Sequence, residues 1–472
     1  MGKLLQSGRP GAKNSYGRDM TQRHPVDRVP PLGRLSALGL QHVLAMYAGA
    51  VAVPLILGQA LKLPQGDVIY VINADLFTCG IATLITTIGF WKIGFKLPVI
   101  QGAAFAVLTP MILIGQRDGL RAVYGAIIVG GVIVFLLSPY FSRLLRFFPP
   151  VVRGSIVTVI GISLLPVAVQ WAAGNPAKGS PADPESVALA IGVLLLIIAL
   201  YRLFSGFIGR IAVLLGAAVG TVVAALLGLT DFSGVPDADW LGVTTPFHFG
   251  APVFSLSAIA AMTLALLVVM METTGNSLAV GEIVDRPVDS DRLARGLRAD
   301  GLSTALGGIL NAFPYTAYAQ NAGLVRLTGV RSRYVVAAAG VFLIVLGLVP
   351  KLAAVVASIP APVLGGAGLA MFGAVAAVGI RTLTQVDFER NGNLIIVAVA
   401  LALALIPVAS PNFYEKFPNG AQTVLNSGIT AGSVAAVLLN LVFNVFSREP
   451  RASRVPEVPR TRRSRPVDVP GS

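Results

Sequence analysis

The sequence contains one carboxylate, Glu272, within a segment that is otherwise apolar. Glu272 follows directly on the apolar run 258–271. At the centre of a membrane helix an acidic side chain costs at least about 2.5–3.5 kcal/mol on insertion scales. We therefore expect Glu272 to face a polar cavity, where it would bind a substrate or carry a proton. The alternative is a strut that forms hydrogen bonds with neighbouring backbone.

Two adjacent amides occupy another apolar stretch. Gln320 and Asn321 lie within residues 314–328. A primary amide offers two donors and an acceptor oxygen with two lone pairs. This pattern matches the edge of a purine or pyrimidine, which alternates C=O and N–H groups. The alternative is that the amides join neighbouring helices.

Four further side chains are candidates for a supporting role. His42 lies early in the first apolar segment and could bridge to Glu272, although a purely structural histidine is equally compatible with the sequence. Asp300 is a candidate proton site, whereas a structural role is favoured for Asp75. Phe105 offers an aromatic face that could stack on a planar ligand, whereas a Phe taken alone in a membrane helix is usually a packing residue.

The composition shows which class of protein positions these residues. Of 472 residues, 55% are hydrophobic and only 12% are charged, and the mean hydropathy is +0.77. A soluble domain carries about 25% charged residues, so a soluble enzyme, a disordered chain and a fibrous protein are excluded. One cysteine and three histidines exclude a disulfide framework and leave little for a metal site. We predict an all-α polytopic membrane protein without a metal or an organic cofactor.

A bilayer-spanning helix needs about 20 largely apolar residues, and the chain offers about fourteen such segments. They are 36–58, 68–90, 99–114, 122–138, 151–171, 187–204, 208–230, 255–281, 297–312, 314–328, 334–350, 361–380, 393–409 and 421–446. An even number places both ends of the chain on the same side of the membrane.

Two of these segments are short and interrupted. The third, 99–114, follows Pro98, and the tenth, 314–328, opens at Pro314. They are seven segments apart, and because seven is odd the second half must be inverted relative to the first. Paired interrupted segments in an inverted repeat indicate a transporter binding site. The alternative is two ordinary kinked helices.

The basic residues predict the orientation. Most of the 36 Lys and Arg lie in the tails, 1–34 and 447–472, or in loops predicted on the same side. By the positive-inside rule both termini are cytoplasmic. The first 30 residues lack the apolar core of a signal peptide, so we expect the first segment to direct insertion. No aromatic residues interleave with the C-terminal arginines, so we predict no nucleic-acid partner despite the net charge of +14.

Three motifs together resemble one transporter family. They are Gln41-His42, Glu272-Thr273-Thr274-Gly275, and Gln320-Asn321-Ala322-Gly323 followed by Thr328. They resemble the nucleobase–ascorbate transporter family (nucleobase:cation symporter-2), and in particular its bacterial xanthine and uric acid permease branch. The similarity covers residues 35 to 446, which is nearly the whole predicted membrane portion.

The resemblance implies a fold of two inverted repeats of seven segments, with a short strand in the third and the tenth. It implies a core (substrate-binding) domain, 35–138 and 255–350, and a gate domain, 151–230 and 361–446. Members of the family are typically homodimers in the inner membrane that combine proton symport with an elevator-like motion.

The resemblance also implies roles for the candidate residues. Glu272 would accept hydrogen bonds from purine N–H groups, Gln320 would make a two-point contact with the purine edge, and Phe105 would stack on the ring. Backbone near Ala104 and Ala319 would complete the pocket.

Three side chains, His42, Asp300 and Asn321, would support the site or be linked to the proton. At Asn276 some relatives carry Asp, and a neutral amide cannot titrate, which puts the coupling stoichiometry in doubt. The small Ala104 leaves room near the ligand and favours tolerance of the 8-oxo group of uric acid.

We therefore predict a transporter that imports xanthine or uric acid with protons and contacts membrane lipid. The alternative within this class is a permease for uracil or another nucleobase. An inorganic-anion transporter is disfavoured because an anion site prefers helix N-termini and a cation, not the Glu272 carboxylate. A membrane enzyme is disfavoured because the sequence lacks a GxSxG elbow and a Walker loop.

Overall fold

The computed structural model describes residues 24–144, 147–175, 180–389 and 391–446. Most of the two predicted tails, 1–23 and 447–472, lies outside these ranges. The described chain opens with the short helix η1, Pro25–Asp27.

The first half of the chain contains eleven elements after η1. They are α1 (Leu32–Ala60), α2 (Gln65–Thr87), β1 (Gln101–Ala103), η2 (Phe105–Val107), α3 (Leu108–Asp118), α4 (Leu120–Leu144), α5 (Pro150–Ala172), α6 (Pro184–Leu203), α7 (Phe207–Arg210), α8 (Ala212–Leu226) and α9 (Gly234–Asp237).

The second half resembles the first in that two helices again precede a short strand and a short helix. Its elements are α10 (Leu256–Ile283), α11 (Ser290–Ile309), β2 (Tyr315–Ala317), α12 (Ala319–Thr328), α13 (Arg333–Gly347), α14 (Pro350–Ala357), α15 (Ala361–Leu383), α16 (Asn391–Ala409), α17 (Asn419–Leu425), α18 (Gly428–Asn440) and η4 (Leu441–Val445).

The helices confirm the polytopic membrane class. In the described ranges nine helices are long and apolar enough to cross a membrane, and ten if α13 and α14, which are bent by 82°, count as one span. Shorter elements such as α3, α8 and α12 account for most of the remaining predicted segments. The count of fourteen therefore stays a prediction.

Some predicted bounds differ from the observed helices. The ninth segment was predicted over 297–312, but α11 begins at Ser290, because the Asp289 carboxylate accepts a hydrogen bond from the Arg292 N–H and caps the helix. The last segment, 421–446, divides into α17 and α18, and the Ser427 hydroxyl caps the second of these.

The strands predicted in the third and tenth segments are both present. β1 and β2 pair antiparallel, with Gly102 opposite Thr316 at the centre. The Ala104 N–H donates to the Pro314 carbonyl over 2.9 Å, and the Tyr318 N–H donates to the Ile100 carbonyl over 3.2 Å. These two bonds exchange under a two-fold rotation through the sheet, as an inverted repeat requires.

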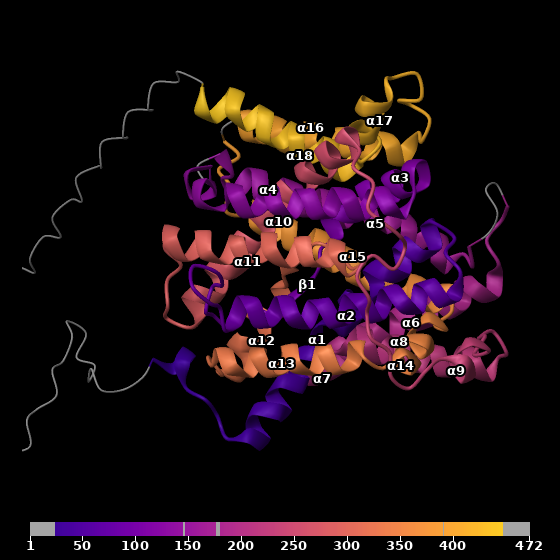
Figure 1. Ribbon diagram of the computed structural model, residues 1–472. Coiled ribbons are helices and arrows are strands. Elements are labelled where there is room, and N and C mark those ends of the chain that lie inside the picture. The colour runs from indigo at the N-terminus through magenta and orange to yellow at the C-terminus, as the bar shows by residue number, and fades with distance from the viewer. Residues whose placement is uncertain (1–23, 145–146, 176–179, 390, 447–472) are drawn as a thin grey trace, which may run out of the picture.

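The helices pack in two groups. The first group comprises α1–α4 and α10–α14, with α4 against α10 and α11, and α2 against α13. The second group comprises α5–α8 and α15–α18, with α15 against α5 and α6, while the short helix α9 contacts α14 of the first group. The sheet lies inside the first group, where β1 contacts α1 and α2 while β2 contacts α10 and α11 (Figure 1). This arrangement buries both interrupted segments away from lipid, as exposed backbone at membrane depth demands.

The outer helices of the second group expose apolar side chains. Leu195 and Ile198 of α6, and Val222 and Leu226 of α8, are all more than half exposed. Extended apolar faces of this kind are typical of helices in contact with lipid or with another protein, which supports their place in a bilayer.

Candidate functional site

Two buried aspartates hold the beginnings of the two strands. Asp300 of α11 accepts a hydrogen bond from the Gln101 side-chain amide of β1 over 3.0 Å. Asp75 of α2 accepts one from the Tyr315 hydroxyl of β2 over 3.1 Å. Each aspartate thus comes from one half of the chain and holds the strand of the other half. Buried carboxylates require such partners, because an unpaired charge is costly at this depth.

Two side chains of helix α10 form hydrogen bonds with the backbone of Ala317, the last residue of β2. The Thr273 hydroxyl accepts a hydrogen bond from the Ala317 N–H over 3.1 Å, and the Asn276 amide donates to the Ala317 carbonyl over 2.6 Å. The Thr273 hydroxyl also lies 3.1 Å from the Thr316 hydroxyl. Because Glu272 directly precedes Thr273, these bonds place it beside the start of α12.

The two adjacent amides of α12 lie in different environments. Asn321 is buried, and its side-chain nitrogen donates to the Pro98 carbonyl. His42 is also buried and lies against the Asn321 side chain. The contact of His42 is therefore with Asn321, and not the bridge to Glu272 that the sequence left open.

Glu272 and Gln320 have free polar groups. Glu272 is partly exposed, while Gln320 and its neighbour Ala319 are exposed. Within the described ranges neither Glu272 nor Gln320 forms a hydrogen bond or an ion pair. A carboxylate and an amide in neighbouring elements are thus available to a ligand with alternating N–H and C=O groups.

The aromatic candidate lies where the two groups of helices meet. The half-buried Phe105 ring contacts Phe372 of α15 edge-on, with 5.7 Å between ring centroids. η2, which carries Phe105, also packs against α10. Ala104 is fully buried, and its N–H is bonded to the opposite strand. The ring therefore contacts the second group, while the short helix that carries it lies against α10.

Sequence reasoning overlooked Tyr318. Its hydroxyl donates to the Ala103 carbonyl over 2.9 Å. Its ring covers Gly102 so closely that a Cβ at that glycine would overlap with the ring. The glycine in the short third segment was the one available signal that a ring approaches there.

Two arginines of the second group were also overlooked as site residues. A Cβ at Gly323 of α12 would lie 2.5 Å from Nη1 of Arg210, which belongs to α7. A Cβ at Gly275 of α10 would lie 3.9 Å from Nη1 of Arg153, which belongs to α5. Both arginines thus approach the glycines that end the two motifs, and only the approach to Gly323 requires that a side chain be absent.

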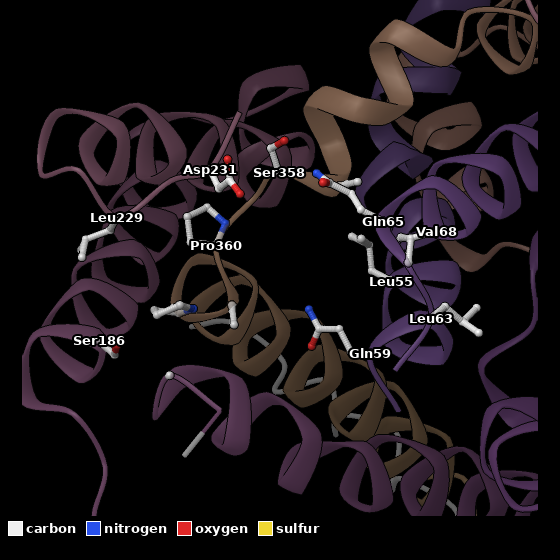
Figure 2. Close-up of a pocket in the computed structure, with 14 residues that line it drawn as sticks. Leu55, Gln59, Leu63, Gln65, Val68, Ser186, Leu229, Asp231, Ser358 and Pro360 are labelled. Carbon is white, nitrogen blue, oxygen red and sulfur yellow. The ribbon is translucent and has the colours of Figure 1, made fainter. Parts of the chain in front are cut away.

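A cavity of about 500 Å³ opens elsewhere between the two groups. Gln59 of α1 and Gln65 of α2 line it from the first group, and Ser186 of α6 and Pro362 of α15 line it from the second. Figure 2 shows the Gln59 and Pro360 side chains on either side of the space. The described lining includes none of the candidate residues.

Comparison with known proteins gives a consistent family assignment. The model of a family described as "Permease family" matches residues 33–413. The xanthine permease of Bacillus subtilis (strain 168) is 44% identical over 416 residues, which is 88% of this chain and 95% of the relative. The uric acid transporter UacT of Escherichia coli (strain K12) is 45% identical over 427 residues, or 89% and 88% of the two chains.

Solved structures support the fold alone. The transmembrane domain of the cyanobacterium bicarbonate transporter BicA has a TM-score of 0.57 at 14% identity, covering 88% of this chain and 99% of that domain. SLC26A9 has a TM-score of 0.59 at 13% identity, covering 88% of this chain and 66% of its own.

Proposed function

The chain belongs to the nucleobase:cation symporter-2 family, in the branch of xanthine and uric acid permeases, and on that premise we propose that it imports xanthine or uric acid by proton symport. The family consists of permeases, so the protein is a transporter of purine nucleobases and not an enzyme. The choice between the two substrates, the coupling ion and the mechanism belong to the proposal.

The observation that carries the proposal is the pair of free polar side chains. Glu272 on α10 and Gln320 on α12 form no hydrogen bond within the described ranges, whereas most polar side chains around them are engaged. A purine placed here would donate N–H groups to the Glu272 carboxylate and exchange two hydrogen bonds with the Gln320 amide. The Phe105 ring would stack on its face.

We assign the two groups of helices to a core and a gate domain. The core domain corresponds to 35–138 and 255–350 and holds Glu272, Gln320 and the sheet. The gate domain corresponds to 151–230 and 361–446. Phe105 contacts the gate residue Phe372, and the cavity near Gln59 opens between the same two groups. Both features support a substrate path along this boundary and an elevator-like movement of the core against the gate.

Asp300 is the proposed proton-linked residue. It is buried, it is hydrogen-bonded to Gln101 of the sheet, and Thr273 beside Glu272 lies within its hydrogen-bonding reach. A proton on Asp300 would therefore change the contacts of the strand that ends at the site. His42, Asn276 and Asn321 are supporting residues, because the side-chain nitrogens of both amides already bond backbone carbonyls.

The remaining parts of the proposal concern the setting. The basic tails and loops support cytoplasmic termini and residence in the inner membrane. A homodimer follows from the family resemblance, and light scattering of the detergent-solubilised protein measures it directly. Uracil or another nucleobase remains the alternative substrate.

Uptake of labelled xanthine and labelled uric acid tests the proposal, in cells that lack their own purine permeases and with or without a protonophore. We expect saturable uptake that the protonophore abolishes. Gln320→Ala and Glu272→Gln should lower the affinity about 10- to 100-fold, since each removes one or two hydrogen bonds to the purine.

Matched controls use exposed residues outside the site. Gln116→Ala on α3 and Glu185→Gln on α6 make the same chemical changes and should leave uptake unaltered. Membrane-inserted protein that takes up uracil, and neither purine, would overturn the substrate assignment.

A further inference from the structure

The two motif glycines have equivalent positions relative to the proposed ligand groups. Gly275 follows Glu272 by three residues on α10, and Gly323 follows Gln320 by three residues on α12. Residues three apart on a helix lie on neighbouring positions of one face. Each glycine therefore lies one turn beyond a side chain proposed to bind the purine.

A gate-domain guanidinium approaches each of these glycines. Nη1 of Arg153 lies 3.9 Å from where a Cβ of Gly275 would be, and Nη1 of Arg210 lies 2.5 Å from where a Cβ of Gly323 would be. A side chain at Gly323 would displace Arg210. At Gly275 the distance is that of an ordinary van der Waals contact, so only Gly323 is required to be small. Two positive charges thus reach the core helices that carry Glu272 and Gln320.

Both guanidinium groups are without a hydrogen-bonding partner among the described residues. In the described part of the chain neither arginine forms a hydrogen bond or an ion pair, and the Nε atom of each is buried. The Arg210 side chain also lies near the Tyr201 phenol of α6. A guanidinium inside a membrane protein is costly unless it meets an acceptor, and its planar fork fits a bidentate anionic acceptor.

The topology places the two arginines at the same end of the gate domain. Arg153 lies in the first turn of α5, and α6 runs back along α5 before α7 brings Arg210. Since α10 packs against α12, the two charges lie along one boundary of the site. A ligand held by Glu272 and Gln320 would meet them on its gate-facing side.

We propose that Arg153 and Arg210 bind the negative charge of a singly deprotonated oxopurine and form the gate-domain side of the substrate site. This inference rests on the proposed function and specifies the ionic form of its substrate. The carboxylate on the core side would accept the remaining ring N–H groups, while the arginines would donate to the deprotonated edge. Charge-assisted hydrogen bonds of this kind are about twice as strong as neutral ones.

The test measures dissociation constants for xanthine and urate with the purified full chain in lipid nanodiscs, at pH values on either side of the first deprotonation of xanthine. Urate remains a monoanion over this range, so the ratio of the two constants cancels any titration of the protein that affects both ligands equally, and the arginine variants identify the rest. We expect the xanthine-to-urate ratio to fall about tenfold as xanthine loses its proton, because one charge-assisted bond is gained.

Variants assign the effect to the two arginines. Arg153→Gln and Arg210→Gln should make the ratio independent of pH. The Lys variants should keep a pH-dependent ratio with weaker binding overall, because the charge stays while the planar fork is lost. Arg202→Gln, an exposed arginine at the end of α6, is the matched control and should behave as the unmodified protein.

A ratio that stays constant with pH in the unmodified protein overturns the inference, as does an unchanged pH-dependent ratio in both Gln variants. If the Gln variants do not fold, the pH dependence of the ratio in the unmodified protein and in the Lys variants still tests the inference. Failure of the proposed function looks different, because the unmodified protein would then bind neither purine at any pH.

Discussion

The β1 half and the β2 half of the site share a backbone and differ in side chains. Each strand begins at a residue held by a buried aspartate and ends at a carbonyl that accepts a side-chain hydrogen bond. In the β1 half, the amide Gln101 is fully buried and bonded to Asp300. In the β2 half, the amide Gln320 is exposed and free within the described ranges.

The difference between Gln101 and Gln320 distinguishes residues that support the fold from residues that are available to a ligand. The two-fold symmetry determines where the two strands and the short helices that follow them lie. This arrangement requires only small residues in the strands and buried side chains that form hydrogen bonds with them. The ligand is asymmetric, so the groups proposed to bind it are not related by the two-fold. The second half supplies Glu272 and Gln320, whereas the first half supplies Phe105 and, from the gate domain, Arg153 and Arg210. An amide in an interrupted segment is therefore a ligand group only where no neighbour engages it.

The largest expected effect distinguishes the two buried aspartates. Asp300→Asn keeps an acceptor for Gln101 but removes the proposed proton site, so we expect purine accumulation against a gradient to be lost while binding persists. Asp75→Asn keeps its acceptor for Tyr315 and should leave accumulation intact. Uptake in vesicles with an imposed pH gradient measures the difference. Equal loss in both variants would show that the two halves are functionally alike.

The next effect concerns the centres of the strands. Gly102→Val forces side-chain atoms against the Tyr318 ring and should destabilise the protein by about 3 kcal/mol. Thr316→Val at the two-fold-related position loses only the contact with Thr273 and should cost about 1 kcal/mol. Thermal unfolding of the purified protein compares them. Similar unfolding temperatures would refute the close approach of the ring.

The third prediction compares the two glutamines. Gln101→Leu leaves the Asp300 carboxylate without its amide donor and should lower stability by about 2 kcal/mol. Gln320→Leu removes no intramolecular bond and should leave the unfolding temperature unchanged while purine affinity falls about 10- to 100-fold. Unfolding and binding are measured on the same samples. Destabilisation by the substitution at Gln320 would assign it to the scaffold.

The smallest effect concerns the carbonyls that end the strands. Asn276→Ala removes the donor to the Ala317 carbonyl, and Tyr318→Phe removes the donor to the Ala103 carbonyl. Each should lower stability by about 1 kcal/mol, the net value of one hydrogen bond. Chemical denaturation of the two variants gives the comparison. A much larger loss at Asn276 would mean that its contact with the strand also supports Glu272.

Much of the fold could be predicted because its causes are local. Apolar length predicted the long helices, and Pro98 and Pro314 marked the two interrupted segments whose strands the structure contains. The start of α11 was misplaced because its first turns are rich in charge, although Asp289 caps it. Local composition could not show that this helix extends beyond its apolar stretch.

The candidate site was less predictable because its decisive contacts join distant parts of the chain. Gln320 and Asn321 are adjacent amides and look equivalent in the sequence. Only the Pro98 carbonyl, 223 residues away, distinguishes the engaged amide from the free one. Arg153 and Arg210 looked like ordinary basic residues near loops, since nothing local shows that they reach α10 and α12.

The pairing of β1 with β2 also has a consequence for biosynthesis. Gln101 pairs with Ala317, so the first strand leaves the ribosome long before its partner exists. At 5–20 residues per second the interval is on the order of 10 to 40 s. During that time the nascent first half carries an unpaired strand at membrane depth, which is costly without shielding. We therefore expect a chain truncated before Tyr315 to be degraded rather than to persist as a half-transporter.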